Sequence, residues 1–227
     1  MFNVTDSMPA ATDQLTDQPF SYPVSESILA WQGRIFDVVA DTVDLGAQGA
    51  VPREYVQHPG AVAIVALDEA GQVALVNQYR HPVREILWEF PAGLLDIGGE
   101  SGLAAAKREL AEEADLTATD WHVLVDLYTS PGGTNEALRI YLARGLSSTK
   151  TKFARFDEEA TMQVRWLSLD DVVAGVQAGR LHNPTTVVGA LATSAARQTN
   201  WATLRPADAP WAARPAWQSP HSPARPA

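Results

Sequence analysis

The chain has 227 residues, of which 46% are hydrophobic and 19% are charged, so it can bury a core in one or at most two domains. Its 27 acidic residues against 17 basic ones give a net charge of −10, and without a basic run this balance argues against binding to a nucleic-acid backbone. The absence of cysteine excludes disulfides, thiolate zinc sites and cysteine nucleophiles.

The N-terminal end of the sequence is polar. Residues 1–20 show no periodicity, which predicts a flexible arm. No Lys or Arg precedes Arg34, whereas a secretory signal begins with positive charge. No apolar run approaches the roughly 20 residues that a membrane helix needs. We therefore expect a soluble, cytoplasmic protein.

Short segments rich in β-branched and aromatic residues predict the strands. These segments are residues 35–45, 53–57, 61–67, 73–79, 85–90, 121–128, 138–143 and 162–167. Asp68-Glu-Ala-Gly71 lies between the third and the fourth of them, and its glycine predicts a tight turn that joins these two strands as a hairpin.

The first predicted helix follows a glycine-rich loop at residues 93–99. It spans residues 101–114, where Leu103, Ala106 and Leu110 recur at helical spacing.

Capping residues predict two later helices. Ser168 with Asp171 forms a capping-box pattern for a helix that runs to Gln177, and Asn183-Pro184 marks the start of the last helix. Many strands with three helices indicate one α/β domain over residues 21–200.

Residues 201–227 form a tail rich in proline, alanine and tryptophan. Proline at this density opposes both helix and strand pairing, which predicts an irregular or extended segment. Alternatively, a proline-rich segment of this kind is a ligand for another protein. Three tryptophans are expected to hold the tail against the body: Trp201, Trp211 and Trp217.

The helix predicted at residues 101–114 carries three glutamates on one face. At about 100° per residue, Glu109 and Glu113 lie about 40° apart around the axis, and Glu112 lies about 60° to the other side of Glu109. Like charges at this spacing repel, and the simpler interpretation is a solvent-facing acidic helix. The alternative is a site for Mg²⁺ or Mn²⁺, because these cations prefer carboxylate oxygens.

The order of residues around this helix resembles the Nudix box. Gly93, Glu100 and the run Arg108-Glu-Leu-Ala-Glu-Glu113 follow the pattern of a glycine, a glutamate and then R-E-U-x-E-E, where U is aliphatic, and the seven residues between Glu100 and Arg108 match it. Two positions depart from the pattern, since six residues rather than five separate Gly93 from Glu100, and Asp115 replaces the closing glycine. Neither departure affects a candidate metal ligand.

The resemblance implies an α/β Nudix fold, in which a mixed sheet lies between helices, with an N-terminal antiparallel strand region. It also implies metal-dependent hydrolysis of a nucleoside diphosphate that is linked to another group. In the family, residues matching Gly93, Glu100 and Arg108 are structural, and the last two form a pair. The implied ligands of Mg²⁺ or Mn²⁺ are the carboxylates of Glu109, Glu112 and Glu113 and the backbone carbonyl of Ala92, with Glu112 also catalytic.

Three further segments resemble the ADP-ribose pyrophosphatase branch of the family: Gln78-Tyr-Arg-His-Pro82, Trp88-Glu-Phe-Pro-Ala-Gly93 and Ser130-Pro-Gly-Gly-Thr-Asn-Glu136. This likeness implies cleavage of ADP-ribose to AMP and ribose 5-phosphate. The simpler interpretations are a turn for the third segment and a surface charge for Arg80. The substrate-binding residues that the likeness implies are Arg80, Ser130, Gly132 and Glu136.

Members of this branch are typically homodimers that exchange N-terminal strands. Arg53 matches an arginine that reaches the partner's substrate, although a charge on an edge strand is the simpler interpretation. The branch also takes its catalytic base from a late loop, which makes Glu159 the candidate and Glu158 the second choice. A solvated acidic turn is the alternative for that loop.

Two other functions fit the same residues. The first is hydrolysis of another nucleoside diphosphate sugar or of a damaged nucleotide. The second is a non-catalytic Nudix-fold sensor that binds ADP-ribose. Silent members commonly lose box glutamates, and all three are present in this chain.

Overall fold

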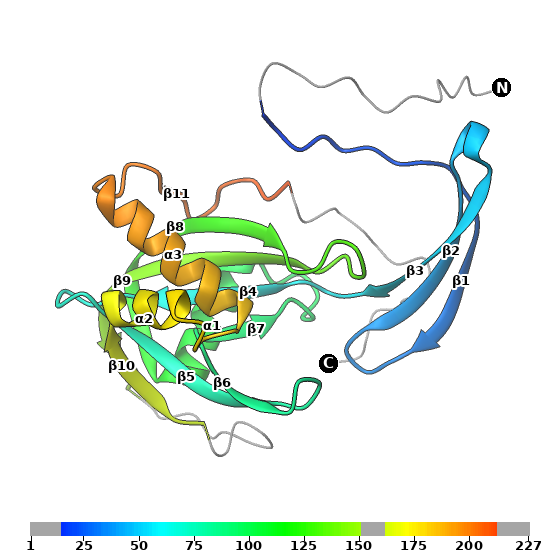
Figure 1. Cartoon of the computed structure of the whole chain (residues 1–227). Coiled ribbons are helices and arrows are strands. Elements are labelled where there is room, and N and C mark those ends of the chain that lie inside the picture. The colour runs from blue at the N-terminus through cyan, green and yellow to red at the C-terminus, as the bar shows by residue number, and fades with distance from the viewer. Residues whose placement is uncertain (1–14, 151–161, 213–227) are drawn as a thin grey trace. The chain divides into compact units, whose positions relative to one another are not determined.

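The computed structural model describes residues 15–150 and 162–212 (Figure 1). Within these ranges the chain forms two compact units. The smaller unit contains residues 15–58 and 130–135, and the larger unit contains the other described residues. No helix in the described part of the chain has the length and hydropathy needed to span a bilayer.

The smaller unit is an antiparallel three-stranded sheet in the order β1-β2-β3. Its strands are β1 (Val24–Gln32), β2 (Asp37–Asp44) and β3 (Ala50–Gln57). The sequence predicts β2 and β3 but misses β1. Eight of the nine residues of β1 are exposed, so the strand has no buried face, and apolar side chains do not alternate with polar ones along it. Residues 130–135 join this unit through a bridge between Thr134 and Val56.

The larger unit contains two sheets and three helices. One sheet has the strand order β11-β8-β9-β4-β7, with β4 parallel to β9 and the other pairs antiparallel, and the second has the order β10-β5-β6. The strands are β4 (Ala61–Ala66), β5 (Gln72–Arg80), β6 (Glu85–Glu89), β7 (Ala92–Leu94), β8 (Leu116–Tyr128), β9 (Ala137–Ser148), β10 (Val164–Ser168) and β11 (Arg205–Pro206).

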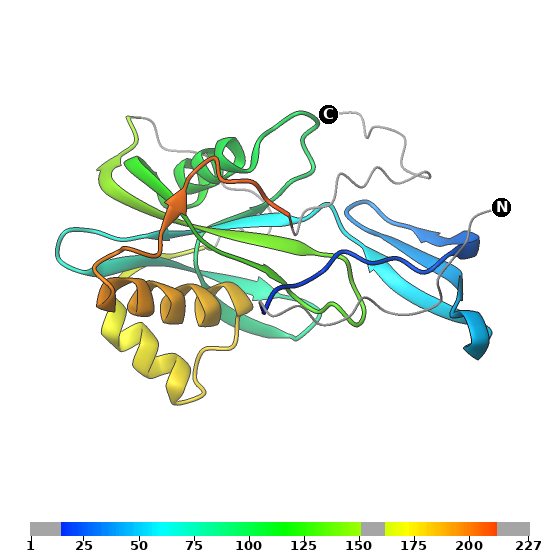
Figure 2. The same cartoon turned by 90° about the horizontal axis from the view of Figure 1, so that it is seen from above.

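The helices of the larger unit lie on two sides of the strands. Figure 2 shows α1 (Gly102–Ala114) on one side, and α2 (Leu169–Gln177) and α3 (Pro184–Gln198) on the other. The caps expected at Ser168 and Asn183 are present, because each side chain accepts a hydrogen bond from a backbone N–H of the first turn. Ser101, expected as the first residue of its helix, is the N-cap of α1 and accepts from the Ala104 N–H. The expected mixed sheet between helices is therefore confirmed.

Strand β4 separates two halves of the hydrophobic core. Ala63 and Val65 face the cluster under α2 and α3, whereas Val62 and Ile64 face the cluster under α1. Because every residue of β4 is buried, the strand is a continuous apolar run without alternation.

The prediction of a hairpin between β4 and β5 is wrong, although the predicted turn between them is present. The turn forms, with the Asp68 N–H donating to the Gln72 carbonyl at 2.9 Å and Gly71 at φ +76°. Only Leu67 and Val73 then bridge the two strands. The strands separate because β4 pairs with β7 on one edge and β9 on the other, which leaves no edge for β5.

The expectation that proline keeps the tail out of strand pairing is also wrong at one point. Arg205 and Pro206 form β11, which pairs with the outer edge of β8. An edge position tolerates proline because its missing N–H can face away from the ladder. The expectation for Trp201 and Trp211 is confirmed, since each packs against one of the two core clusters, whereas Trp217 lies outside the described residues.

Buried Arg139 holds the segment after β11. Its guanidinium donates to Asp126 at 2.7 and 2.9 Å and to the carbonyls of Ala209 and Pro210 at 2.7 and 3.0 Å. The ring of Trp211 lies 4.7 Å from the same guanidinium. Residues 209–211 are therefore fixed to the body of the larger unit.

Helix α1 ends at Asp115, which occupies the left-handed region at φ 55° and ψ 35°. Side chains other than glycine cost roughly 1 kcal/mol in this conformation. We expect Asp115→Gly to raise the free energy of unfolding by up to about 1 kcal/mol in urea titration and to leave kcat unchanged. Asp115→Ala is the comparison and should lower stability. A large change in kcat for the glycine variant would mean that Asp115 takes part in the reaction.

Candidate active site

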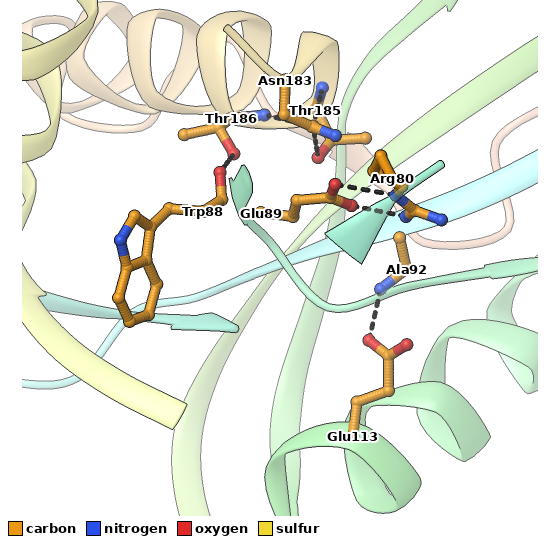
Figure 3. Close-up of polar contacts among 8 residues, drawn as sticks. All are labelled: Arg80, Trp88, Glu89, Ala92, Glu113, Asn183, Thr185 and Thr186. Atoms are coloured by element: carbon orange, nitrogen blue, oxygen red, sulfur yellow. Dashed lines mark hydrogen bonds and ion pairs between the residues drawn. The ribbon is translucent and has the colours of Figure 1, made fainter. Parts of the chain in front are cut away.

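Helix α1 and strand β7 bring two box glutamates to the same short stretch of backbone. The backbone N–H of Ala92 donates to Oε2 of Glu113 at 2.9 Å (Figure 3). A Cβ built on the next residue, Gly93, would overlap the carboxylate of Glu109. Glu109 and Glu113 therefore reach adjacent residues of β7. The first residues of the predicted glycine-rich loop belong to this strand.

Arg108 connects the loop before α1 to the glutamates of the helix. It donates to both carboxylate oxygens of Glu100 at 3.0 Å, so the pair expected from the seven-residue spacing is present. Its Nη1 also donates to Glu109 at 2.6 Å and to Glu112 at 3.0 Å. The hydrogen bond from Arg108 holds the pKa of Glu100 below its usual value, and the bond to Glu100 raises the pKa of Arg108.

The three box carboxylates differ in their surroundings. Glu113 is 5% exposed, while the side chains of Glu109 and Glu112 are 12% and 38% exposed. In the described residues, no three acidic or histidine side chains gather into a ready metal cluster. The guanidinium of Arg108 contacts Glu109 and Glu112, and the Ala92 N–H contacts Glu113.

The donor set nevertheless suits a hard divalent cation. A buried carboxylate and a second carboxylate approach one strand, and Gly93 leaves the space that the second one occupies. The chemistry of Glu109, Glu113 and the backbone of Ala92 therefore fits Mg²⁺ or Mn²⁺.

Arg80 lies at the end of β5, and its partner is Glu89 at the end of β6. The guanidinium donates from Nε to Oε1 at 2.8 Å and from Nη2 to Oε2 at 2.5 Å (Figure 3). Glu89 is a functional candidate that the sequence analysis missed. The sequence feature that could have identified it is an acidic residue inside the aromatic segment Trp88-Glu-Phe90, where a strand residue is expected to be apolar.

The remaining candidate residues are divided between the two units. Arg53 lies on β3 of the smaller unit, where its Nη1 donates to the carbonyl of Pro52 at 2.8 Å. Ser130 and Gly132 belong to the same unit, and the Ser130 carbonyl accepts from Gly133 at 2.9 Å, which is the turn expected for this segment. Glu136 lies in the larger unit, where it accepts from the Thr129 hydroxyl at 2.6 Å. The candidate bases Glu158 and Glu159 lie outside the described residues.

A family model described as the NUDIX domain matches residues 57–186, which is more than half of the chain. The chain belongs to the Nudix family. This Nudix protein is 44% identical over 183 residues to an ADP-ribose pyrophosphatase of Mycobacterium tuberculosis (strain ATCC 25618 / H37Rv), covering 81% of this chain and 87% of the relative.

Two further relatives and one solved structure resemble this Nudix protein. An ADP-ribose pyrophosphatase of Bacillus subtilis (strain 168) is 34% identical, covering 69% of this chain and 83% of its own. A methanol dehydrogenase activator of Bacillus methanolicus is also 34% identical, with 70% and 84% covered. The crystal structure of an ADP compounds hydrolase matches with a TM-score of 0.66 at 19% identity, covering 82% of this chain and all of that one, and this confirms the fold.

The close contact between Gly93 and Glu109 gives a testable effect in this Nudix protein. Gly93→Ala should displace the Glu109 carboxylate and lower kcat/KM by roughly tenfold, because even a small misplacement of a reacting group is costly. Gly98→Ala is the matched control, since nothing lies within 4 Å of a Cβ at Gly98. The measurement is kcat/KM of both variants by steady-state kinetics. Equal rates for the two would show that the position of Glu109 is not critical.

Proposed function

We propose that this protein hydrolyses the pyrophosphate bond of ADP-ribose and releases AMP and ribose 5-phosphate. The observation that carries the proposal is the meeting of α1 and β7, where Glu109 and Glu113 reach adjacent backbone positions. The 44% identity to an ADP-ribose pyrophosphatase supports the choice of substrate. One water adds to a phosphorus as the bridging P–O bond breaks, so the reaction needs no further reactant.

The proposed metal is Mg²⁺ or Mn²⁺, held by Glu109, Glu112, Glu113 and the carbonyl of Ala92. When bound, a divalent cation neutralises the charge of the pyrophosphate and lowers the pKa of a coordinated water. The chain itself contributes hydrogen bonds to these carboxylates. The Ala92 N–H orients Glu113, and Arg108 orients the other two carboxylates.

Arg80 is the proposed ligand of the substrate's pyrophosphate, because a guanidinium can bind two phosphate oxygens at once. Glu159 is the proposed general base and accepts the proton of the attacking water, with Glu158 as the second choice. The other proposed substrate contacts are Arg53, Ser130, Gly132 and Glu136.

We also propose that the protein is a homodimer that exchanges its N-terminal strands. The sheet of the smaller unit supports this, because β1 is an edge strand whose apolar side chains Val24, Ile28 and Trp31 are exposed. Light scattering coupled to gel filtration is expected to give twice the chain mass of 24.5 kDa. A monomeric mass would contradict the exchange.

Product analysis tests the proposed activity. The purified protein is incubated with ADP-ribose and a panel of other nucleoside diphosphate sugars and damaged nucleotides, with Mg²⁺ or Mn²⁺ and with or without EDTA. We expect AMP and ribose 5-phosphate in amounts that EDTA abolishes. Faster turnover of another panel member would assign a different substrate. Calorimetric binding of ADP-ribose without turnover would instead identify a sensor.

A further inference from the structure

We propose that Glu89 is a positioning residue that fixes the guanidinium of Arg80 for binding the substrate's pyrophosphate. The inference rests on the proposed function, in which Arg80 is a phosphate ligand. It assigns to Glu89 no contact with substrate or metal, and its effect passes entirely through Arg80.

The geometry of the pair is that of a fixed fork. Two parallel hydrogen bonds, of 2.8 and 2.5 Å, join the Nε–Nη2 edge of Arg80 to both oxygens of Glu89. Two such bonds set the plane of the guanidinium as well as its location. The Nη1 end is therefore oriented by the same contact.

The two partners differ sharply in exposure. The side chain of Glu89 is 2% exposed, whereas that of Arg80 is 41% exposed. The register places the two residues at opposite ends of the ladder between β5 and β6. Glu89 lies opposite Val76, and Arg80 lies opposite Glu85. The Arg80 side chain therefore reaches back along the strands to the buried Glu89. The pair thus combines a buried anchor with a cation that solvent, and hence an anionic ligand, can reach.

Stability alone is a poor explanation for this arrangement. Removing a carboxylate from water is costly, and the attraction to a half-exposed arginine often does not compensate for the loss of hydration. An apolar side chain at position 89 would avoid that cost. Orientation of Arg80 is a function that only an acceptor with two oxygens at this position supplies.

The backbone around Glu89 is itself held on both sides. The hydroxyl of buried Thr186, in the first turn of α3, donates to the carbonyl of Trp88 at 2.9 Å (Figure 3). Three residues after Glu89, Ala92 donates to Glu113 of the box. One short segment of backbone therefore carries both the anchor of Arg80 and the contact to the candidate metal ligands, which keeps the two parts of the site in register.

The decisive variant is Glu89→Gln, which keeps the shape of the side chain but loses its charge and one acceptor. We expect KM for ADP-ribose to rise roughly 10- to 100-fold, the effect of weakening one charge-assisted contact, while kcat changes only a few-fold. The Mn²⁺ affinity, measured by electron paramagnetic resonance, should stay unchanged. The matched control is Asp126→Asn, which weakens a bidentate pair of the larger unit away from Arg80, the pair with Arg139, and should lower Tm without raising KM.

A double-mutant cycle separates positioning from a structural role. In an Arg80→Ala background, Glu89→Gln should raise KM no further, because the residue through which it acts is gone. Additive effects on KM in the cycle would overturn the inference, as would an unchanged KM in the single variant. If Glu89→Gln does not fold, Arg80→Lys replaces it, since lysine keeps the charge but cannot form the fork, and an unchanged KM for that variant would also overturn the inference.

Failure of the proposed function has a different signature. A wild-type protein that binds a methylene-bridged ADP-ribose analogue in calorimetry but releases no AMP from ADP-ribose is not a hydrolase. The dissociation constants of the analogue for the same variants then replace KM in the cycle. A wild-type protein that does not bind the analogue at all would overturn both proposals.

Discussion

Replacing Glu113 by glutamine is expected to lower kcat for ADP-ribose by about 100-fold or more and to shift Tm by only a few degrees. Glutamine retains an oxygen that can accept from the Ala92 N–H, and its helix propensity is close to that of glutamate. It does not retain the negative charge that a divalent cation requires. The measurements are initial rates at saturating Mg²⁺ and a thermal melt of the same sample.

Glu69→Gln is the control for this variant, because Glu69 is exposed in the turn before β5. It removes one carboxylate from the same unit and should leave both kcat and Tm as in the wild type. Turnover within a few-fold of wild type for Glu113→Gln would show that α1 is not the metal site.

Glu159→Gln should lower kcat by roughly 10²–10⁴-fold with little change in KM, the range typical of losing a general base. The box glutamates are proposed as metal ligands, and coordination reduces their basicity, whereas a carboxylate from another loop remains able to accept a proton. The measurement is kcat and KM for ADP-ribose across a pH series.

Glu158→Gln is the matched control, one residue away, and should have a much smaller effect. If the two effects are reversed, Glu158 is the base. If neither variant loses more than tenfold, water activation depends on the metal and a box glutamate instead.

The parts of the site that could be predicted from sequence are those made by residues close together in the chain. Helix α1 follows from its apolar spacing, and the pair between Arg108 and Glu100 follows from their spacing. The left-handed conformation of Asp115, which replaces the closing glycine of the box, is likewise decided within one helix end.

Contacts between distant segments could not be read in this way. The turn at Asp68 formed as its residues require, yet the partners of β4 were decided by β7 and β9, which lie far along the chain. The pair between Arg80 and Glu89 depends on the register of two strands and on how far an arginine reaches, and no local pattern encodes either one.

The packing of Trp211 against Arg139 bears on where expression fragments of this protein are cut. The NUDIX match ends at residue 186, inside the first turn of α3. A fragment trimmed to that boundary would lose nearly all of the helix that supplies Ala190 to the core. It would also strip the buried guanidinium of Arg139 of two carbonyl acceptors and its aromatic neighbour. The C-terminal boundary of the NUDIX match is therefore too short for an expression fragment of this protein, which should extend to at least residue 212.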